Sequence, residues 1–300
     1  MKIFCTGASG YIGGSVAAHL IAAGHQVTGL VRSPEKAEAV RARGIQPLLG
    51  TLDDGQILAQ AAQAADIVVN AASADHTGAV AALLGAVAGS GKMFIHTSGS
   101  SIVGTRSKGA RSDDTFDEDT PITPSPARVA RVALNQLILG YRAKGCRPVI
   151  VCPSLIYGIG HGAGRDSVQV PLLIKLAKKR GNAAHAGPGE NIWSNVHIDD
   201  LVPLYLLAVD KAPAGSFYFA ENGENSMREA CVAINRMFGF TGPPSSMTMQ
   251  EAASEWSEGT TEDTMASNSR VRAKRARAEL GWQPKARGLI EEIEQGCYRE

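Results

Sequence analysis

The chain has 300 residues, of which 30 are Lys or Arg and 29 are Asp or Glu, so its formal net charge is +1. This balance, with 44% hydrophobic residues, argues against a nucleic-acid-binding protein and is typical of a globular one. The length suits one large α/β unit or a main domain that carries a smaller lobe.

Other broad classes are also disfavoured by the sequence. No uncharged apolar run of about 18 residues is present, and the Ala-rich stretch 71–88 is interrupted by Asp75 and His76. No basic, apolar leader precedes the first strand-forming residues, so we expect a cytoplasmic protein. The five cysteines lack any C-x-x-C or Cys/His spacing. We therefore expect buried, reduced thiols, no disulfide and no metal site.

The first motif in the chain is a strand followed by a glycine-rich turn. Strand-forming residues 2–6 lead into Gly7, Gly10 and Gly13, whose spacing is G-x-x-G-x-x-G. Missing side chains permit a tight turn and let backbone N–H groups approach a pyrophosphate. A helix that starts near Tyr11 would direct its positive N-terminal dipole at that phosphate. Since the strand, turn and helix come in this order, the motif predicts a dinucleotide site rather than a plain strand–turn–helix unit.

Short β-rich runs then alternate with Ala- and Leu-rich stretches up to residue 152. The predicted strands are 26–32, 45–49, 66–71, 92–98 and 147–152, and the predicted helices are 34–43, 54–64, 74–89 and 125–144. Nearly continuous apolar strands are typical of a sheet that is covered by helices on both faces. The sequence therefore predicts an α/β protein in which residues 1–152 form a doubly wound parallel (Rossmann) sheet.

Residues 153–300 are expected to form mainly a small mixed α/β substrate lobe, parts of which return to the sheet. The predicted elements are a loop over 153–165, helices over 167–180 and 199–210, a strand over 216–220, and a helix start at a capping box formed by Ser226 and Glu229. We interpret the polar stretch 254–262 as a mobile loop. The basic run from Arg270 to Arg277 is predicted to be a helix with a solvated charged face rather than a ligand site.

Several segments taken together resemble one known family. The segments are residues 6–13, 70–72, 96–100, 152–158 and 196–201, followed near the end by Leu-Gly-Trp-Gln-Pro at 280–284. In this order they resemble the NAD-dependent epimerase/dehydratase branch of the extended short-chain dehydrogenase/reductase superfamily. The resemblance covers nearly the whole chain and is strongest to a group of uncharacterised bacterial and fungal oxidoreductases. It implies a Rossmann fold and a nicotinamide dinucleotide cofactor.

The motif and the resemblance together give a set of expected cofactor-binding residues. They are Gly7, Ser9, Gly10, Tyr11, Ile12, Gly13, Arg32, Ser33, Lys36, Thr51, Leu52, Asn70, Ala71, Ala72, Thr97, Ser98, Arg131, Pro153, Leu155 and Ile156. Sites that prefer NAD place an acidic residue at the end of the second strand, where this chain has Arg32. With Ser33 and Lys36 nearby, Arg32 would suit a 2′-phosphate, so we favour NADP(H) over NAD(H) unless Arg32 points to solvent. Thr51 and Leu52 are expected beside the adenine.

The family's catalytic motif, Ser/Thr followed by Tyr-x-x-x-Lys, is missing. The tyrosine position holds Ala127, the lysine position Arg131, and a following glutamate position Asn135, while the serine position holds Gly99. Alanine cannot donate a proton, and a guanidinium stays protonated and is a poor acid. Arg131 either bonds the nicotinamide ribose as the lysine would or is a plain surface arginine.

A relocated proton donor would have to come from loops at the carboxyl edge of the sheet. The candidate catalytic residues are His161, Tyr157, Ser98, Ser100 and Arg131. His161 is the first choice for the donor because a titratable group in a glycine-rich loop has little packing role. Tyr157 is the second choice, and packing beneath that loop is an alternative role for it.

Three functions remain open. The leading one is an NADP-dependent oxidoreductase that transfers hydride between the nicotinamide and a small carbonyl, alcohol or imine substrate. The second is a non-catalytic NADP-binding redox sensor or regulator, and the third is a sugar-nucleotide epimerase or dehydratase. We expect a small-molecule substrate and no nucleic-acid or membrane partner. A homodimer is compatible with the sequence, which leaves the oligomeric state open.

Overall fold

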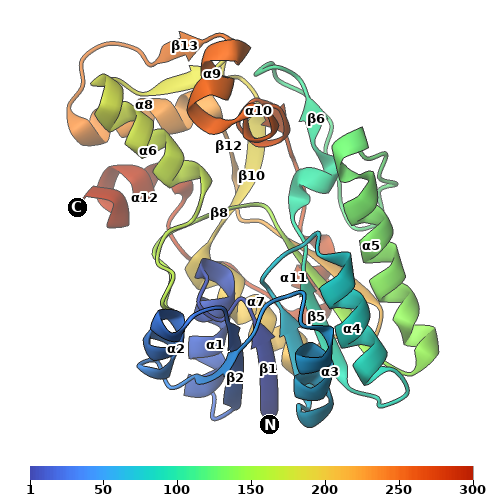
Figure 1. Ribbon diagram of the computed structural model, residues 1–300. Coiled ribbons are helices and arrows are strands. Elements are labelled where there is room, and N and C mark those ends of the chain that lie inside the picture. The colour runs from blue at the N-terminus through green and yellow to red at the C-terminus, as the bar shows by residue number, and fades with distance from the viewer. Residues whose placement is uncertain (300) are drawn as a thin grey trace.

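The computed structural model describes residues 1–299, which form a parallel sheet with a lobe above its carboxyl edge (Figure 1). The seven strands, in spatial order, are β11 (Ser216–Ala220), β7 (Arg147–Pro153), β5 (Met93–Thr97), β4 (Ile67–Asn70), β1 (Lys2–Thr6), β2 (Gln26–Val31) and β3 (Gln46–Leu49). All six pairings in this sheet are parallel. The doubly wound Rossmann sheet is confirmed.

Helices cover both faces of this sheet and create two cores. On one face pack α1 (Tyr11–Ala22), α2 (Pro34–Arg41), α7 (Ile198–Lys211) and α11 (Lys274–Leu280), and on the other α3 (Gly55–Ala64), α4 (Thr77–Val87) and α5 (Val129–Gly140). The middle of β1 is apolar because Ile3 and Cys5 enter the first core and Phe4 enters the second. A strand that is buried on both faces favours a nearly continuous apolar sequence.

The lobe has its own core and three smaller sheets. Its strands are β8 (Leu155–Tyr157), β10 (Ile192–His197) and β12 (Glu224–Ser226) in one sheet, β9 (Ala184–Ala186) with β13 (Ser245–Met247), and β6 (Thr105–Arg106) with β14 (Ser267–Asn268). Its helices are α6 (Gln169–Arg180), α8 (Met227–Phe238), α9 (Met249–Trp256), α10 (Glu258–Thr260) and α12 (Leu289–Gln295). The predicted capping box of α8 is present. Since α7, β11 and α11 pack on the large sheet, the chain returns to it, as the prediction for residues 153–300 allowed.

Three local predictions were wrong. The expected loop 153–165 contains β8, because its apolar residues pair with β10 inside the lobe. The expected mobile loop 254–262 is helical, comprising the end of α9, then α10 and the start of a π-helix (Thr261–Met265). The helix predicted from Arg270 begins only at Lys274. Residues 267–273 are instead extended, since the first two pair with β6 and two later ones bridge to Phe116 and Trp193.

The basic run from Arg270 to Arg277 is paired with carboxylates, while its basic side chains from Arg272 onward stay 36–59% exposed. Arg270 and Arg272 both bond to Glu224, and Arg277 bonds to Glu221. The half-buried Glu118 accepts three backbone N–H groups, from β11 and from the first turn of α11. These contacts tie the C-terminal segment to the edge strand of the large sheet.

Three further features concern membrane spans, cysteines and metal ligands. Within residues 1–299 no helix is long and apolar enough to cross a membrane. All five cysteines are free thiols, and four of them are buried. The same part of the chain contains no group of three or more side chains suited to a metal ion.

Candidate functional site

The glycine-rich turn between β1 and α1 forms a cradle of exposed backbone groups. Gly7 has a φ of +75°, a conformation that favours glycine, and its carbonyl accepts the Gly10 N–H at 2.8 Å. Gly10 is the N-cap of α1 and offers no side chain to cap the helix. The first turn of α1 also carries no acidic residue. Its N–H groups and the helix dipole are therefore available to an anion.

A cavity of about 500 Å³ opens beside this turn. It is lined by Gly7, Ser9, Gly10, Leu30, Val31, Arg32, Thr51, Leu52, Asp53, Ala71, Ala72 and His76. Eight of these twelve belong to the expected cofactor set, so the structure brings together the phosphate turn and the predicted adenine end. The size and shape of this cavity, which runs from the turn to the end of β2, suit the adenosine and pyrophosphate of a dinucleotide.

Sequence reasoning missed one polar pair in this cavity. The imidazole Nε2 of His76 lies 3.1 Å from a carboxylate oxygen of Asp53, and its Nδ1 accepts the Ala79 N–H at the start of α4. His76 is the N-cap of α4, which begins at Thr77. The predicted helix over 74–89 includes His76 and therefore hides this capping position.

Arg32 and its neighbours lie at the open end of the cavity. Arg32 and Lys36 are exposed. Ser33 is the N-cap of α2, and its hydroxyl accepts the Lys36 N–H at 3.4 Å. An exposed guanidinium on the cavity wall fits a phosphate at the ribose of an adenosine, although Ser33 is already engaged by its own helix.

Arg131 lies in the first turn of α5, beside the residues that follow β5. Its Nε donates to Asp75 at 2.7 Å, a second guanidinium nitrogen bonds the other Asp75 oxygen, and a third donates to the Ser101 hydroxyl at 3.1 Å. A Cβ built on Gly99 would lie 3.4 Å from this guanidinium. The side chain is only 14% exposed, so Arg131 is held by its partners rather than being a plain surface arginine.

A buried polar chain crosses the ends of three neighbouring strands beneath this site. The Thr6 hydroxyl donates to Asn70 Oδ1 at 2.6 Å, and Asn70 Nδ2 lies 3.0 Å from His96 Nδ1. The opposite nitrogen of His96 is buried and has no hydrogen-bond partner within residues 1–299. Burial, and then the charge of Arg131, lower the pKa of His96 to about 4.

The serines that follow β5 have different surroundings. Ser98 is buried, and its hydroxyl accepts a hydrogen bond from Asn135 at 3.0 Å. Ser100 is buried against Ser269, whose hydroxyl bonds both the Ser100 hydroxyl and its carbonyl at 2.8 Å. Thr97 bonds the hydroxyl of the buried Tyr205 at 2.7 Å. Ser98 therefore belongs with Arg131 on the α5 side, whereas Ser100 supports the segment that crosses to the lobe.

The two candidate proton donors both have polar partners within the fold. The Tyr157 ring is fully buried in the lobe core, and its hydroxyl donates to the Arg287 carbonyl at 2.6 Å. The imidazole of His161 contacts Asp199 at 2.7 Å and stacks at a tilt on His19 of α1. Neither residue lines the 500 Å³ cavity, and Arg131 does not line it either. Both stay untested as catalytic residues, and their placement favours structural roles.

The loop that carries His161 packs tightly on α1. A Cβ on Gly162 would lie 2.5 Å from Gly14, and one on Gly164 would lie 2.6 Å from Gly10. These glycines thus serve a close approach of two backbones rather than flexibility. The hydroxyl of Tyr11 reaches the carbonyls of residues 157 and 158, both at 2.9 Å. The remaining expected cofactor residues lie nearby in regular elements: Ile12 in α1, Pro153 at the end of β7, and Leu155 and Ile156 in β8.

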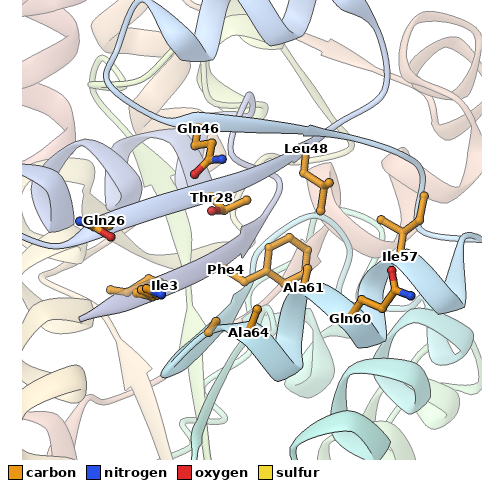
Figure 2. Close-up of a pocket in the computed structure, with 12 residues that line it drawn as sticks. Ile3, Phe4, Gln26, Thr28, Gln46, Leu48, Ile57, Gln60, Ala61 and Ala64 are labelled. Atoms are coloured by element: carbon orange, nitrogen blue, oxygen red, sulfur yellow. The ribbon is translucent and has the colours of Figure 1, made fainter.

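A second cavity, of about 400 Å³, lies at the opposite edge of the sheet (Figure 2). Side chains from β1, β2, β3 and α3 surround it, including Gln26, Gln46 and Gln60. Ligands of doubly wound sheets bind outside the carboxyl ends of the strands. This cavity lies near the amino ends, marked by Lys2 and Gln26, and is not part of the dinucleotide site.

With this geometry in place, comparison with known proteins identifies the family. Residues 3–218 match the NAD dependent epimerase/dehydratase family. The chain belongs to this family. It is 33% identical to Uncharacterized protein YLL056C of Saccharomyces cerevisiae over 98% of both chains. It is 32% identical to Oxidase ucsJ of Acremonium sp, over 98% of this chain and 95% of that protein.

Two further comparisons concern activity and fold. A 4-hydroxy-2-methyl-3-oxo-4-farnesyl-3,4-dihydroquinoline-1-oxide ketoreductase of Stigmatella aurantiaca is 28% identical, over 74% of this chain and 69% of that protein. The dTDP-glucose 4,6-dehydratase of Bacillus anthracis, solved with NAD, has the same fold, with a TM-score of 0.78, 19% identity, and coverage of 98% of this chain and 96% of that one. The family and these relatives identify the chain as an enzyme of the NAD(P)-dependent oxidoreductase type. Its cofactor is a nicotinamide dinucleotide.

The crowding at Gly13 gives the first prediction. A Cβ there would lie 2.4 Å from the Gly7 carbonyl oxygen, so Gly13→Ala must displace the turn. We expect at least a tenfold loss of NADPH affinity in calorimetric titration and a loss of about 1–3 kcal/mol of folding free energy. Gly85→Ala, in open space on α4, is the matched control and should bind normally. Wild-type affinity and stability in Gly13→Ala would contradict the site.

The buried His96 gives a prediction about pH. Its folded-state pKa of about 4 lies below the ordinary value of 6.5, so the unfolded chain takes up a proton that the folded chain rejects. The free energy of unfolding should therefore fall as the pH decreases from 6.5 to 4, by up to about 3 kcal/mol from this residue. Urea unfolding at several pH values measures it. His96→Gln should flatten this slope and the control His25→Gln should not; equal slopes in all three proteins would refute the assignment.

Proposed function

We propose that the chain is a nicotinamide-dependent carbonyl reductase or alcohol dehydrogenase in which Arg131 takes over the charge stabilisation that the family assigns to Tyr-x-x-x-Lys. The observation that carries this proposal is the position of Arg131. Its guanidinium lies beside Gly99, at the carboxyl end of β5, and is held in place by Asp75 and Ser101. A fixed, largely buried positive charge at this point suits a developing negative charge on a substrate oxygen.

The chemistry requires little else from the protein. A bound nicotinamide supplies the hydride in reduction and accepts it in oxidation. As a C–H bond forms at the substrate carbon, the π electron pair of the carbonyl moves to oxygen, where Arg131 and the Ser101 hydroxyl stabilise it. A guanidinium and a serine hydroxyl are not acids near neutral pH. In this proposal, water supplies the proton that completes the alcohol and returns hydroxide to the solvent.

The relatives support this class of reaction. One relative that covers nearly the whole chain is named an oxidase, and another is a ketoreductase. The sugar-nucleotide dehydratase shares 19% identity and speaks for the fold alone. The absence of Tyr-x-x-x-Lys also favours a second candidate, a dinucleotide-binding sensor without turnover. NADPH consumption in a screen of aldehydes, ketones and cyclic imines separates the two functions.

We also propose that NADP(H) is preferred over NAD(H). Arg32 is an exposed cation on the wall of the adenosine cavity, at the end of β2 where an acidic residue would bind the ribose of NAD. A guanidinium forms charge-assisted hydrogen bonds with a phosphate. Lys36, one turn into α2, adds a second positive charge on the same side.

Arg131 gives a prediction that tests catalysis separately from binding. Arg131→Met keeps most of the side-chain volume and should lower kcat about 10²–10³-fold with NADPH affinity reduced far less, because one preorganised donor to the oxyanion is lost. Asp75→Asn is the matched variant: it removes an anchor of Arg131 but keeps the charge, so its kcat should fall about tenfold or less. Steady-state kinetics on a substrate from the screen measure both. An unchanged kcat in Arg131→Met would rule out this role.

Arg32 gives a prediction about cofactor choice. Wild-type protein should bind NADPH at least tenfold more tightly than NADH, since a charged partner of the 2′-phosphate contributes about 1.5–3 kcal/mol. Arg32→Asp should erase or reverse this preference. Arg147→Asp, the same charge change at the opposite edge of the sheet, is the control. Equal affinities of the wild-type protein for the two cofactors in calorimetry would overturn the proposal.

A further inference from the structure

A third cavity lies in the lobe, between β9, α8 and the segment 240–244 that leads to β13. Its volume of about 260 Å³ is slightly below the range of about 300–1,000 Å³ that is usual for drug-sized ligands, so it suits a small molecule. In Figure 1, α8 and β13 lie at the outer end of the lobe, away from α1. This cavity shares no lining residue with the dinucleotide cavity. It is therefore separate from the site described above.

His185 of β9 is the buried polar side chain of this cavity. The residue is 3% exposed, and its Nδ1 lies 3.0 Å from the Gly187 carbonyl oxygen. Because a carbonyl only accepts, Nδ1 carries the hydrogen and Nε2 of the neutral ring is an acceptor. Burial lowers the pKa of His185, which keeps the ring neutral. Nε2 makes no hydrogen bond within residues 1–299, so the cavity has an unpartnered acceptor on its wall.

Arg228, in the first turn of α8, is held by the same turn as His185. Its Nε donates to the Pro188 carbonyl at 3.1 Å, and its backbone N–H donates to the Gly189 carbonyl at 2.8 Å. A Cβ on Gly189 would lie 2.5 Å from the His185 ring, so this turn also covers the imidazole. Arg228 forms no salt bridge in the described part of the chain. The turn thus fixes an uncompensated guanidinium and an imidazole on one cavity before any ligand binds.

The remaining walls define what kind of ligand fits. The only other charged lining residue is Arg236, which pairs with Glu294 at 3.1 Å, and no acidic residue lines the cavity. Apolar walls come from Val232, Phe240 and two prolines, Pro243 and Pro244. An anionic group is therefore favoured beside Arg228, and a hydrocarbon body is favoured against the apolar walls. Inorganic phosphate would satisfy the first requirement but not the second.

We propose that this cavity binds a small carboxylate with an aromatic or branched hydrocarbon body, with one carboxylate oxygen on the guanidinium of Arg228 and the other sharing a proton with Nε2 of His185. A guanidinium matches the geometry of a carboxylate. The bound anion stabilises the imidazolium, so His185 takes up one proton from the solvent as the ligand binds. The lobe then has a ligand site of its own, and this site does not depend on the proposed function.

Three small probes test the site by calorimetry on the full chain. We expect benzoate to bind about tenfold more tightly than benzamide, which has no charge, and than acetate, which has no hydrocarbon body. Benzoate affinity should be the same with and without NADP, because the two cavities share no residue. The heat of binding should differ between phosphate and Tris buffers at about pH 7, since proton uptake by His185 draws on the buffer. His185→Gln should remove this buffer dependence.

Matched variants locate the binding. Arg228→Met should weaken benzoate binding about tenfold. Arg287→Met, at an exposed arginine of the lobe outside the cavity, should leave it unchanged. Val232→Phe fills the cavity without changing any charge and should abolish binding, so it decides the matter even if Arg228→Met fails to fold.

The outcomes also separate this inference from the proposed function. Benzoate binding that Val232→Phe abolishes, in a protein that reduces no carbonyl compound, would support the lobe site and contradict the reductase proposal. Carbonyl reduction by a protein that does not bind benzoate would do the reverse. Equal affinities for benzoate and benzamide, or benzoate affinity unchanged in the folded Val232→Phe variant, would overturn the lobe site.

Discussion

The close approach of three backbone segments at Gly7 determines the rest of the site. A side chain at Gly7 would lie 2.7 Å from the Ala71 carbonyl, and one at Gly13 would lie 2.4 Å from Gly7 itself. This contact fixes the first turn of α1 against the end of β4. It thereby sets the width of the dinucleotide cavity and the starting point of the β4–α4 connection, which carries Asp75 to Arg131. The backbone contact at Gly7 is thus linked, through Asp75, to the guanidinium of Arg131.

The parts of the fold that repeat a local pattern could be predicted from the sequence, and the rest could not. The alternation of apolar strands and helices, the turn at Gly7–Gly13 and the capping box at Ser226 are each encoded by neighbouring residues. Strand β8 and the extended residues 267–273 are instead determined by partners far along the chain. The same holds for the basic run, in which Arg270 and Arg277 pair with Glu224 and Glu221 from distant segments.

The candidate site shows the same division. Most residues at the phosphate and adenine end were expected, because the glycine motif and the ends of β2, β3 and β4 place them. The catalytic end was harder, because the glycine-rich sequence around His161 suggested little packing there, whereas its glycines allow the loop to lie directly on α1. Arg131 is positioned by Asp75, which comes from a distant segment of the chain. A missing tyrosine in a family motif therefore indicated a changed mechanism but did not show which charged groups remain.

A crystal structure of the protein with NADP bound would test the central claim most directly, since the account requires one dinucleotide to connect the glycine turn with Arg131. The account predicts the pyrophosphate on the backbone N–H groups at the start of α1, the 2′-phosphate beside Arg32, and the nicotinamide beside Gly99 and Arg131. A dinucleotide bound near the amino ends of β1–β3, or one whose nicotinamide points away from Arg131, would contradict it.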